Sequence, residues 1–116
     1  MRIDHPRRGE IWLVRFDPAV GTEIKKTRPA VIISNNMANR YSHAVTVLAI
    51  TARKSSQLFP FETSLPDDTL GLSKRSKIKC DQVRTVDKQR LPKLLGHVDH
   101  ETLLKTEEAL KLHLGF

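Results

Sequence analysis

The chain has 116 residues and a formal net charge of +7, with 20 basic and 13 acidic side chains, 39% hydrophobic residues and 28% charged residues. This length fits one compact domain, and the composition excludes a disordered chain, a collagen-like repeat and a disulfide-rich miniprotein. Cys80 has no second cysteine to pair with, and no apolar run approaches the roughly 20 residues of a membrane span. We therefore expect one cytoplasmic domain over residues 1–116, with residues 1–7 as a flexible tail.

The positive charge is concentrated in the body of the chain. The first 96 residues carry a net charge of +9, whereas the last twenty carry −2. Such asymmetry is typical of a protein whose body faces phosphates while its C-terminal element stays outside the contact surface. A basic face that serves only solubility explains the charge equally well.

Five segments have the composition of β-strands, and one has the periodicity of a helix. The predicted strands cover residues 10–16, 29–34, 44–51, 58–65 and 77–86, with Asn35-Asn36 closing the second and Pro60 interrupting the fourth. A helix is predicted to begin at Asp99 or His100, with Leu103, Leu110 and Leu114 on one face. This order favours a mainly β fold with a C-terminal helix (α+β), as a small closed or half-closed barrel.

Common catalytic and cofactor motifs are missing from the sequence. The five histidines lack the spacing of a zinc site, and there is no phosphate loop, dinucleotide fingerprint or Gly-x-Ser-x-Gly turn. We therefore expect a protein that uses neither a metal nor another cofactor.

Five short motifs in a fixed order give a more specific indication. They are RGEIWLV at 8–14, DPAVGTE at 17–23, KTRPAVIIS at 26–34, AIT at 49–51 and DQVRTVDKQRL at 81–91. In this order and spacing the chain resembles the MazF/PemK (Kid) family of toxin endoribonucleases from type II toxin–antitoxin systems. The resemblance covers nearly the whole chain and implies a small SH3-like barrel that forms a homodimer.

The resemblance places the family's catalytic pair on Arg28 and Thr51. It implies metal-independent RNA cleavage, in which the 2′-hydroxyl attacks the adjacent phosphate and leaves a 2′,3′-cyclic phosphate and a 5′-hydroxyl. Both residue types suit this chemistry. A guanidinium offers two parallel N–H groups to the charged nonbridging oxygens, and a threonine hydroxyl can hold a phosphate or sugar oxygen. Arg28 also precedes Pro29, which favours an extended backbone at Arg28.

Six further residues match substrate-binding positions or lie in the basic segments beside the catalytic pair: Glu23, Lys54, Lys79, Asp81, Gln82 and Arg84. Carboxylates and amides can read the exposed base edges of single-stranded RNA, and the basic side chains can contact phosphates. A structural role is an alternative for Asp81, and Arg84 could instead brace the fold through Asp87. One branch of the family has arginine where this chain has Lys79 and histidine where it has Thr22, so the mechanism of that branch does not transfer whole. Proton transfer stays unassigned, because neither Arg28 nor Thr51 titrates near neutral pH.

The resemblance also implies biological partners. The expected substrate is single-stranded RNA, messenger RNA first and ribosomal RNA as a further candidate, cut at a specific sequence so that translation and growth stop. The expected inhibitor is a MazE-like antitoxin with an acidic, disordered segment that covers Arg28. The alternative hypothesis is a basic barrel without catalytic activity that binds nucleic acid or an acidic protein.

Overall fold

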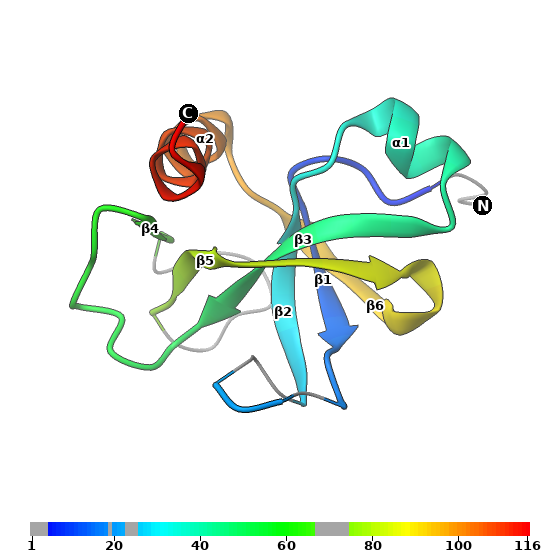
Figure 1. Cartoon of the computed structure of the whole chain (residues 1–116), viewed down its shortest axis with the longest axis horizontal. Helices are drawn as coiled ribbons and strands as arrows, with labels where there is room; N and C mark the ends of the chain where they lie inside the picture. Colours follow the sequence, from blue (N-terminus) through cyan, green and yellow to red (C-terminus); the bar gives the residue numbers. More distant parts are fainter. Residues whose placement is uncertain (1–4, 19, 23–25, 67–74) are drawn as a thin grey trace.

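A computed structural model describes residues 5–18, 20–22, 26–66 and 75–116 (Figure 1). Six strands form one antiparallel sheet in the order β4-β5-β3-β2-β1-β6. Their bounds are β1 (Glu10–Arg15), β2 (Thr27–Ile32), β3 (Ala44–Thr51), β4 (Glu62–Ser64), β5 (Lys77–Asp87) and β6 (Lys93–His97). Two α-helices, α1 (Asn36–Tyr41) and α2 (His100–Leu114), and a short 3-10 helix, η1 (Lys88–Arg90), complete the fold. The predicted mainly β architecture with a C-terminal helix is confirmed.

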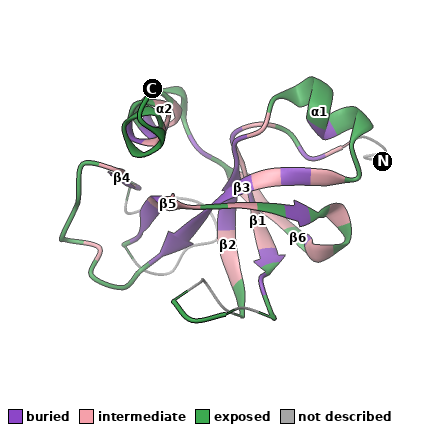
Figure 2. Ribbon diagram, viewed as in Figure 1, coloured by how far each residue is buried: buried purple, intermediate pink, exposed green. Residues whose placement is uncertain are grey.

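The curved sheet has a hydrophobic core on each face. One core lies between the sheet and α2, where Ile50 and Ile78 pack in the same cluster as Ala109 of the helix. The other core includes Val14 and Val47 on the opposite face. Figure 2 shows the buried strands at the centre and the exposed outer side of α2. No helix in the described residues is long and apolar enough to cross a membrane.

The structure corrects four details of the sequence prediction. The first helix was missed, because the Asn35-Asn36 pair reads as a turn. In fact the Asn35 side chain caps α1 by accepting a hydrogen bond from the Ala38 amide at 2.8 Å. The edge strand β6 was also missed, and β4 starts only after Pro60, which has no amide proton to give to a ladder. Leu114 is 47% exposed and lies outside the core that Leu103 and Leu110 contact.

A bulge interrupts the pairing of β3 with β5. Ala49 pairs with Lys79, whereas its neighbour Leu48 pairs with Val83. Residues 80–82 therefore have no opposite residue on β3, and the alternation of side chains between the two faces of β5 shifts by one residue at this point. The bulge contains two of the predicted site residues, Asp81 and Gln82.

Candidate active site

The two predicted catalytic residues lie on neighbouring strands, Arg28 on β2 and Thr51 on β3. The β2–β3 pairs are Ala30–Ala49, Val31–Leu48 and Ile32–Val47. Arg28 and Thr51 each lie two residues beyond the last pair, Ala30–Ala49, so they share the side of the sheet away from α2 with these two alanines.

Local contacts fix the two residues. Arg28 is half-buried at the start of β2, where it pairs with Val14 of β1 and is followed by Pro29. Thr51 is the last residue of β3 and is only 9% exposed. Its Oγ1 accepts a hydrogen bond from the Arg53 amide at 3.1 Å. Since a hydroxyl can accept and donate at once, this contact does not use the Thr51 hydroxyl proton.

Two lysines continue the same row of side chains across the sheet. On β5, Lys77 pairs with Thr51, and Lys79 pairs with Ala49. Lys77 is buried, and its Nζ lies 2.9 Å from Glu62 Oε1 of β4. Lys79 is partly exposed, and its Nζ lies 3.7 Å from Glu62 Oε2. The predicted RNA contact Lys79 thus lies near Thr51, in a cluster with Lys77 and Glu62 that the sequence did not indicate.

Glu62 is ionised within this cluster. Burial raises its pKa, but hydrogen bonds from Lys77 and the Phe59 amide, with the charges of Lys77 and Lys79, bring the pKa below its usual value. By contrast, burial raises the pKa of the Cys80 thiol to about 12. Cys80 is therefore an uncharged core residue that packs on the α2 side.

The bulge residues lie next to this cluster along β5. Asp81 and Gln82 are both half-buried. The Oδ1 atom of Asp81 is buried and receives no hydrogen bond from the described residues. The bulge leaves both residues without an opposite residue on β3.

The remaining predicted residues are more scattered. Lys54 is exposed in the loop after Thr51 and has a left-handed backbone, with φ 51°. Arg84 pairs with Val47, further along β5, where its guanidinium lies 5.7 Å from the Phe16 ring and donates to the Pro18 carbonyl at 3.5 Å. The structure thus places Arg84 against the turn after β1. Glu23 lies outside the described residues.

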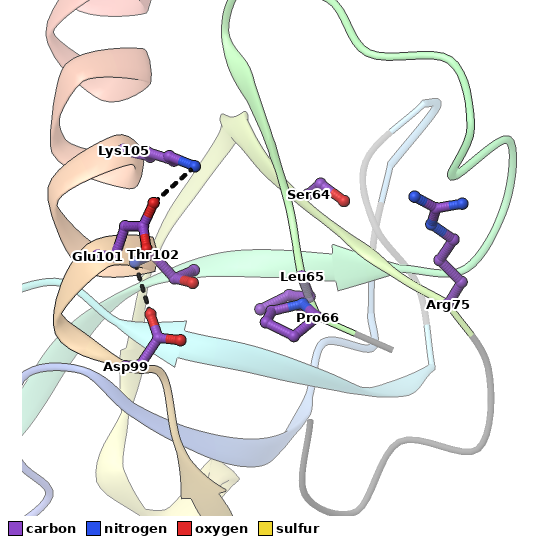
Figure 3. Close-up of a pocket in the computed structure, with 8 residues that line it drawn as sticks. All are labelled: Ser64, Leu65, Pro66, Arg75, Asp99, Glu101, Thr102 and Lys105. Atoms are coloured by element: carbon purple, nitrogen blue, oxygen red, sulfur yellow. Dashed lines mark hydrogen bonds and ion pairs between the residues drawn. The ribbon is translucent and has the colours of Figure 1, made fainter. Parts of the chain in front are cut away.

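A separate cavity of about 320 Å³ opens between the end of β4 and the first turn of α2 (Figure 3). Its lining residues are Ser64, Leu65, Pro66, Arg75, Asp99, Glu101, Thr102 and Lys105. Asp99 caps α2 by accepting from the Thr102 amide at 2.7 Å, and Glu101 pairs with Lys105 at 3.2 Å. These carboxylates stabilise the helix itself, and the lining contains none of the described site residues.

Within the described ranges, no cluster of three or more histidine, cysteine, aspartate or glutamate side chains is arranged to hold an ion.

The comparisons with known proteins complete this description. Residues 7–114 match the family model of the PemK-like, MazF-like toxins of type II toxin–antitoxin systems. The chain belongs to this family. It is 39% identical over 113 residues to endoribonuclease MazF9 of Mycobacterium tuberculosis (strain ATCC 25618 / H37Rv), covering 93% of this chain and 95% of the relative. It is 35% identical over 109 residues to endoribonuclease EndoA of Bacillus subtilis (strain 168), covering 94% of each chain.

Solved structures of the family have the same fold. MazF from Deinococcus radiodurans superposes with a TM-score of 0.83 at 26% identity, covering 97% of this chain and 98% of the other. A mycobacterial endoribonuclease in complex with its cognate antitoxin gives 0.79 at 26% identity, covering 96% of each chain. The family and barrel fold expected from the sequence are confirmed.

Proposed function

We propose that this MazF-like toxin is an endoribonuclease that cuts single-stranded RNA, messenger RNA above all, at specific sites without a metal. The observation that carries the proposal is the register of the sheet. Arg28 and Thr51 each lie two residues beyond the last β2–β3 pair, Ala30–Ala49, and Lys77 and Lys79 of β5 pair with Thr51 and Ala49. The relatives named endoribonucleases support the same activity. The proposed location is the bacterial cytoplasm, where messenger RNA is translated.

In the proposed reaction, the 2′-oxygen of a ribose forms a bond to the adjacent phosphorus, and the bond from phosphorus to the 5′-oxygen breaks. The products are a 2′,3′-cyclic phosphate and a 5′-hydroxyl. Negative charge develops on the nonbridging oxygens in the transition state. Arg28 stabilises this charge with its planar N–H groups, and Thr51 donates its hydroxyl proton to a phosphate or sugar oxygen. Both groups are at least half-buried, so water screens these interactions less than at an open surface.

The neighbouring residues are assigned to substrate binding. Lys54 and Lys79 contact the phosphates on either side of the cut, and Asp81 and Gln82 read base edges from the bulge. Arg84, which packs on Phe16, supplies a further positive charge along β5. Glu23 keeps its predicted role as a base contact. Single-stranded RNA exposes the base edges that such side chains recognise.

We further propose that the toxin acts as a homodimer controlled by a MazE-like antitoxin. Solved complexes of MazE with MazF from Deinococcus radiodurans, and of a mycobacterial endoribonuclease with its cognate antitoxin, support this control. A two-fold pair doubles the formal charge of +7 per chain. An acidic segment that folds onto this surface and covers Arg28 would exclude RNA from the site.

The direct test is to incubate the purified chain with a long single-stranded RNA in EDTA and to sequence the ends of the products. Discrete cuts with 2′,3′-cyclic phosphate and 5′-hydroxyl ends are expected. RNA that is retarded in a gel but stays intact would favour the alternative, a basic barrel that binds nucleic acid without cutting it. Cleavage that requires Mg²⁺ would place the protein in another class of nuclease.

A further inference from the structure

The buried ion pair between Lys77 and Glu62 has no role in the reaction proposed above. The two side chains are 5% and 1% exposed, and the Nζ–Oε1 distance is 2.9 Å. Removing both charges from water costs free energy, and apolar residues of similar size often replace such pairs without loss of stability. Stability alone is therefore a weak reason for this chain to bury an ammonium group at this position.

The position of Lys77 links the pair to the cleavage site. Lys77 is the residue opposite Thr51 in the β3–β5 ladder, so both side chains project from the same side of the sheet. Thr51 and Lys77 thus pair across two neighbouring strands, and Arg28 lies on the next strand, two residues beyond the last β2–β3 pair. The Thr51 end of β3 is held by the strand that carries Lys77.

The pair also holds the loop that follows Thr51. Lys77 Nζ donates to the Gln57 carbonyl at 2.7 Å, and Glu62 Oε1 accepts from the Phe59 amide at 3.0 Å. At the near end of the loop, the Arg53 amide donates to Thr51 Oγ1. The chain from Thr51 to Phe59 is therefore tied to the sheet at both ends. At the far end, the ion pair supplies two side-chain hydrogen bonds beside the backbone bond from the Glu62 amide to the Phe59 carbonyl at 2.9 Å.

A second contact extends the influence of Glu62 to the surface. Its Oε2 atom is buried and lies 3.7 Å from the Nζ of Lys79, which is 27% exposed. Glu62 thus orients one lysine beneath the loop and another beside the proposed path of the RNA. The three charges sum to +1, so the cluster stays attractive to phosphate.

We propose that the Lys77–Glu62 pair positions the cleavage site: it fixes the loop of residues 52–61 and the end of β3, so that the Thr51 hydroxyl meets the reacting phosphate in one geometry. The proposal rests on the proposed RNA cleavage. The pair acts through Thr51 and the loop and makes no contact with RNA. Small displacements of a reacting group can slow an enzyme by about a hundredfold, so a rigid site has a measurable effect on rate.

The test compares three variants: Glu62→Gln, Lys77→Arg and the double variant Glu62→Gln/Lys77→Met, which buries no unpaired charge. Each is measured for thermal melting, for affinity to an RNA with a 2′-O-methyl group at the cleavage site, and for single-turnover cleavage. We expect the double variant to melt near the wild type and to bind the blocked RNA within about threefold. Its cleavage rate should fall by about 10–100-fold. Lys77→Arg, which keeps the positive charge, should cleave faster than the double variant but more slowly than the wild type.

A matched control is Glu101→Gln, which removes a carboxylate from an exposed ion pair on α2 and should leave the rate unchanged. A double variant that melts and cleaves like the wild type would show that the pair is only structural and overturn the proposal. If the double variant does not fold, Glu62→Gln, which changes no volume, replaces it in the test. Wild-type melting and a wild-type cleavage rate for Glu62→Gln would then overturn the proposal. Wild-type protein that leaves RNA intact would instead refute the proposed function, so the two failures are distinguishable.

Discussion

Replacement of Thr51 by valine separates the chemistry of its hydroxyl from the packing of its side chain. Valine has nearly the same shape, so the end of β3 keeps its volume. The change removes the acceptor of the hydrogen bond from Arg53, and that amide belongs to an exposed residue that water can solvate. The loss of one such hydrogen bond costs about 1 kcal/mol of stability.

This structural cost is too small to reduce activity by itself. For a domain of this size, 1 kcal/mol lowers Tm by roughly 4 °C. A protein with the usual stability of about 5–15 kcal/mol would still be almost fully folded at 25 °C. If the hydroxyl donates to a phosphate or sugar oxygen in the transition state, however, the cleavage rate should fall by about 10²–10³-fold.

The assay is single-turnover cleavage of a fluorophore–quencher RNA in EDTA, with melting curves measured in the same buffer. Thr51→Ser keeps the hydroxyl and should retain most of the rate, although serine leaves a small cavity. Valine and serine variants of equal stability should therefore differ strongly in rate. If Thr51→Val cleaves as fast as the wild type, the role assigned to the hydroxyl is wrong.

Three further predictions follow from the site. Arg28→Ala should lower the cleavage rate by about 10²–10³-fold, and Arg28→Lys should lower it by less. Arg40→Ala on the distant α1 serves as the control, and equal cleavage rates for all three variants would exclude Arg28 from the reaction. The affinity for RNA should fall steeply as the salt concentration rises. Lys54→Asn, in which asparagine tolerates the left-handed backbone, should reduce the slope of log K, the RNA association constant, against log [salt] by about 0.7. An unchanged slope would mean that Lys54 contacts no phosphate. The pKa of Glu62 lies below its usual 4.5, so its charged form adds stability above about pH 4.5 that is lost as the pH falls below that value. In an acid titration, Glu62→Gln should lose less folding stability than the wild type. Identical unfolding curves would contradict the lowered pKa.

The sequence predicts the strands well where hydrophobic patterning is strong. The run from Ala44 to Thr51 has the predicted bounds, because eight consecutive residues favour a buried strand. The short helix α1 was missed because its start depends on one capping side chain, Asn35, in a pair that is equally typical of a turn. Asn39 is the buried residue of this helix, and its side-chain amide donates to the Ser34 carbonyl at 2.8 Å, so polar contacts hold the helix in place.

Within the site, the sequence located single residues but not their partners. Arg28 and Thr51 came from the family motifs, whereas nothing local to Lys77 or Glu62 indicates a buried pair. In an alternating strand, Lys77 reads as a solvent-facing residue. It is buried because β4 and the loop before it cover that part of β5, and such long-range contacts leave no mark in a single sequence.

The bulge in β5 has a consequence for how RNA recognition can change. Before the bulge, Ile78 and Cys80 pack towards α2, and after it Val86 packs into the opposite core, so one strand contributes to both sides of the barrel. Asp81 and Gln82, between these two halves, have no opposite residue on β3. Substitutions there change a side chain without altering a β3–β5 pair. If these side chains read bases as proposed, single amino-acid changes can give new RNA preferences while the register of the sheet stays the same.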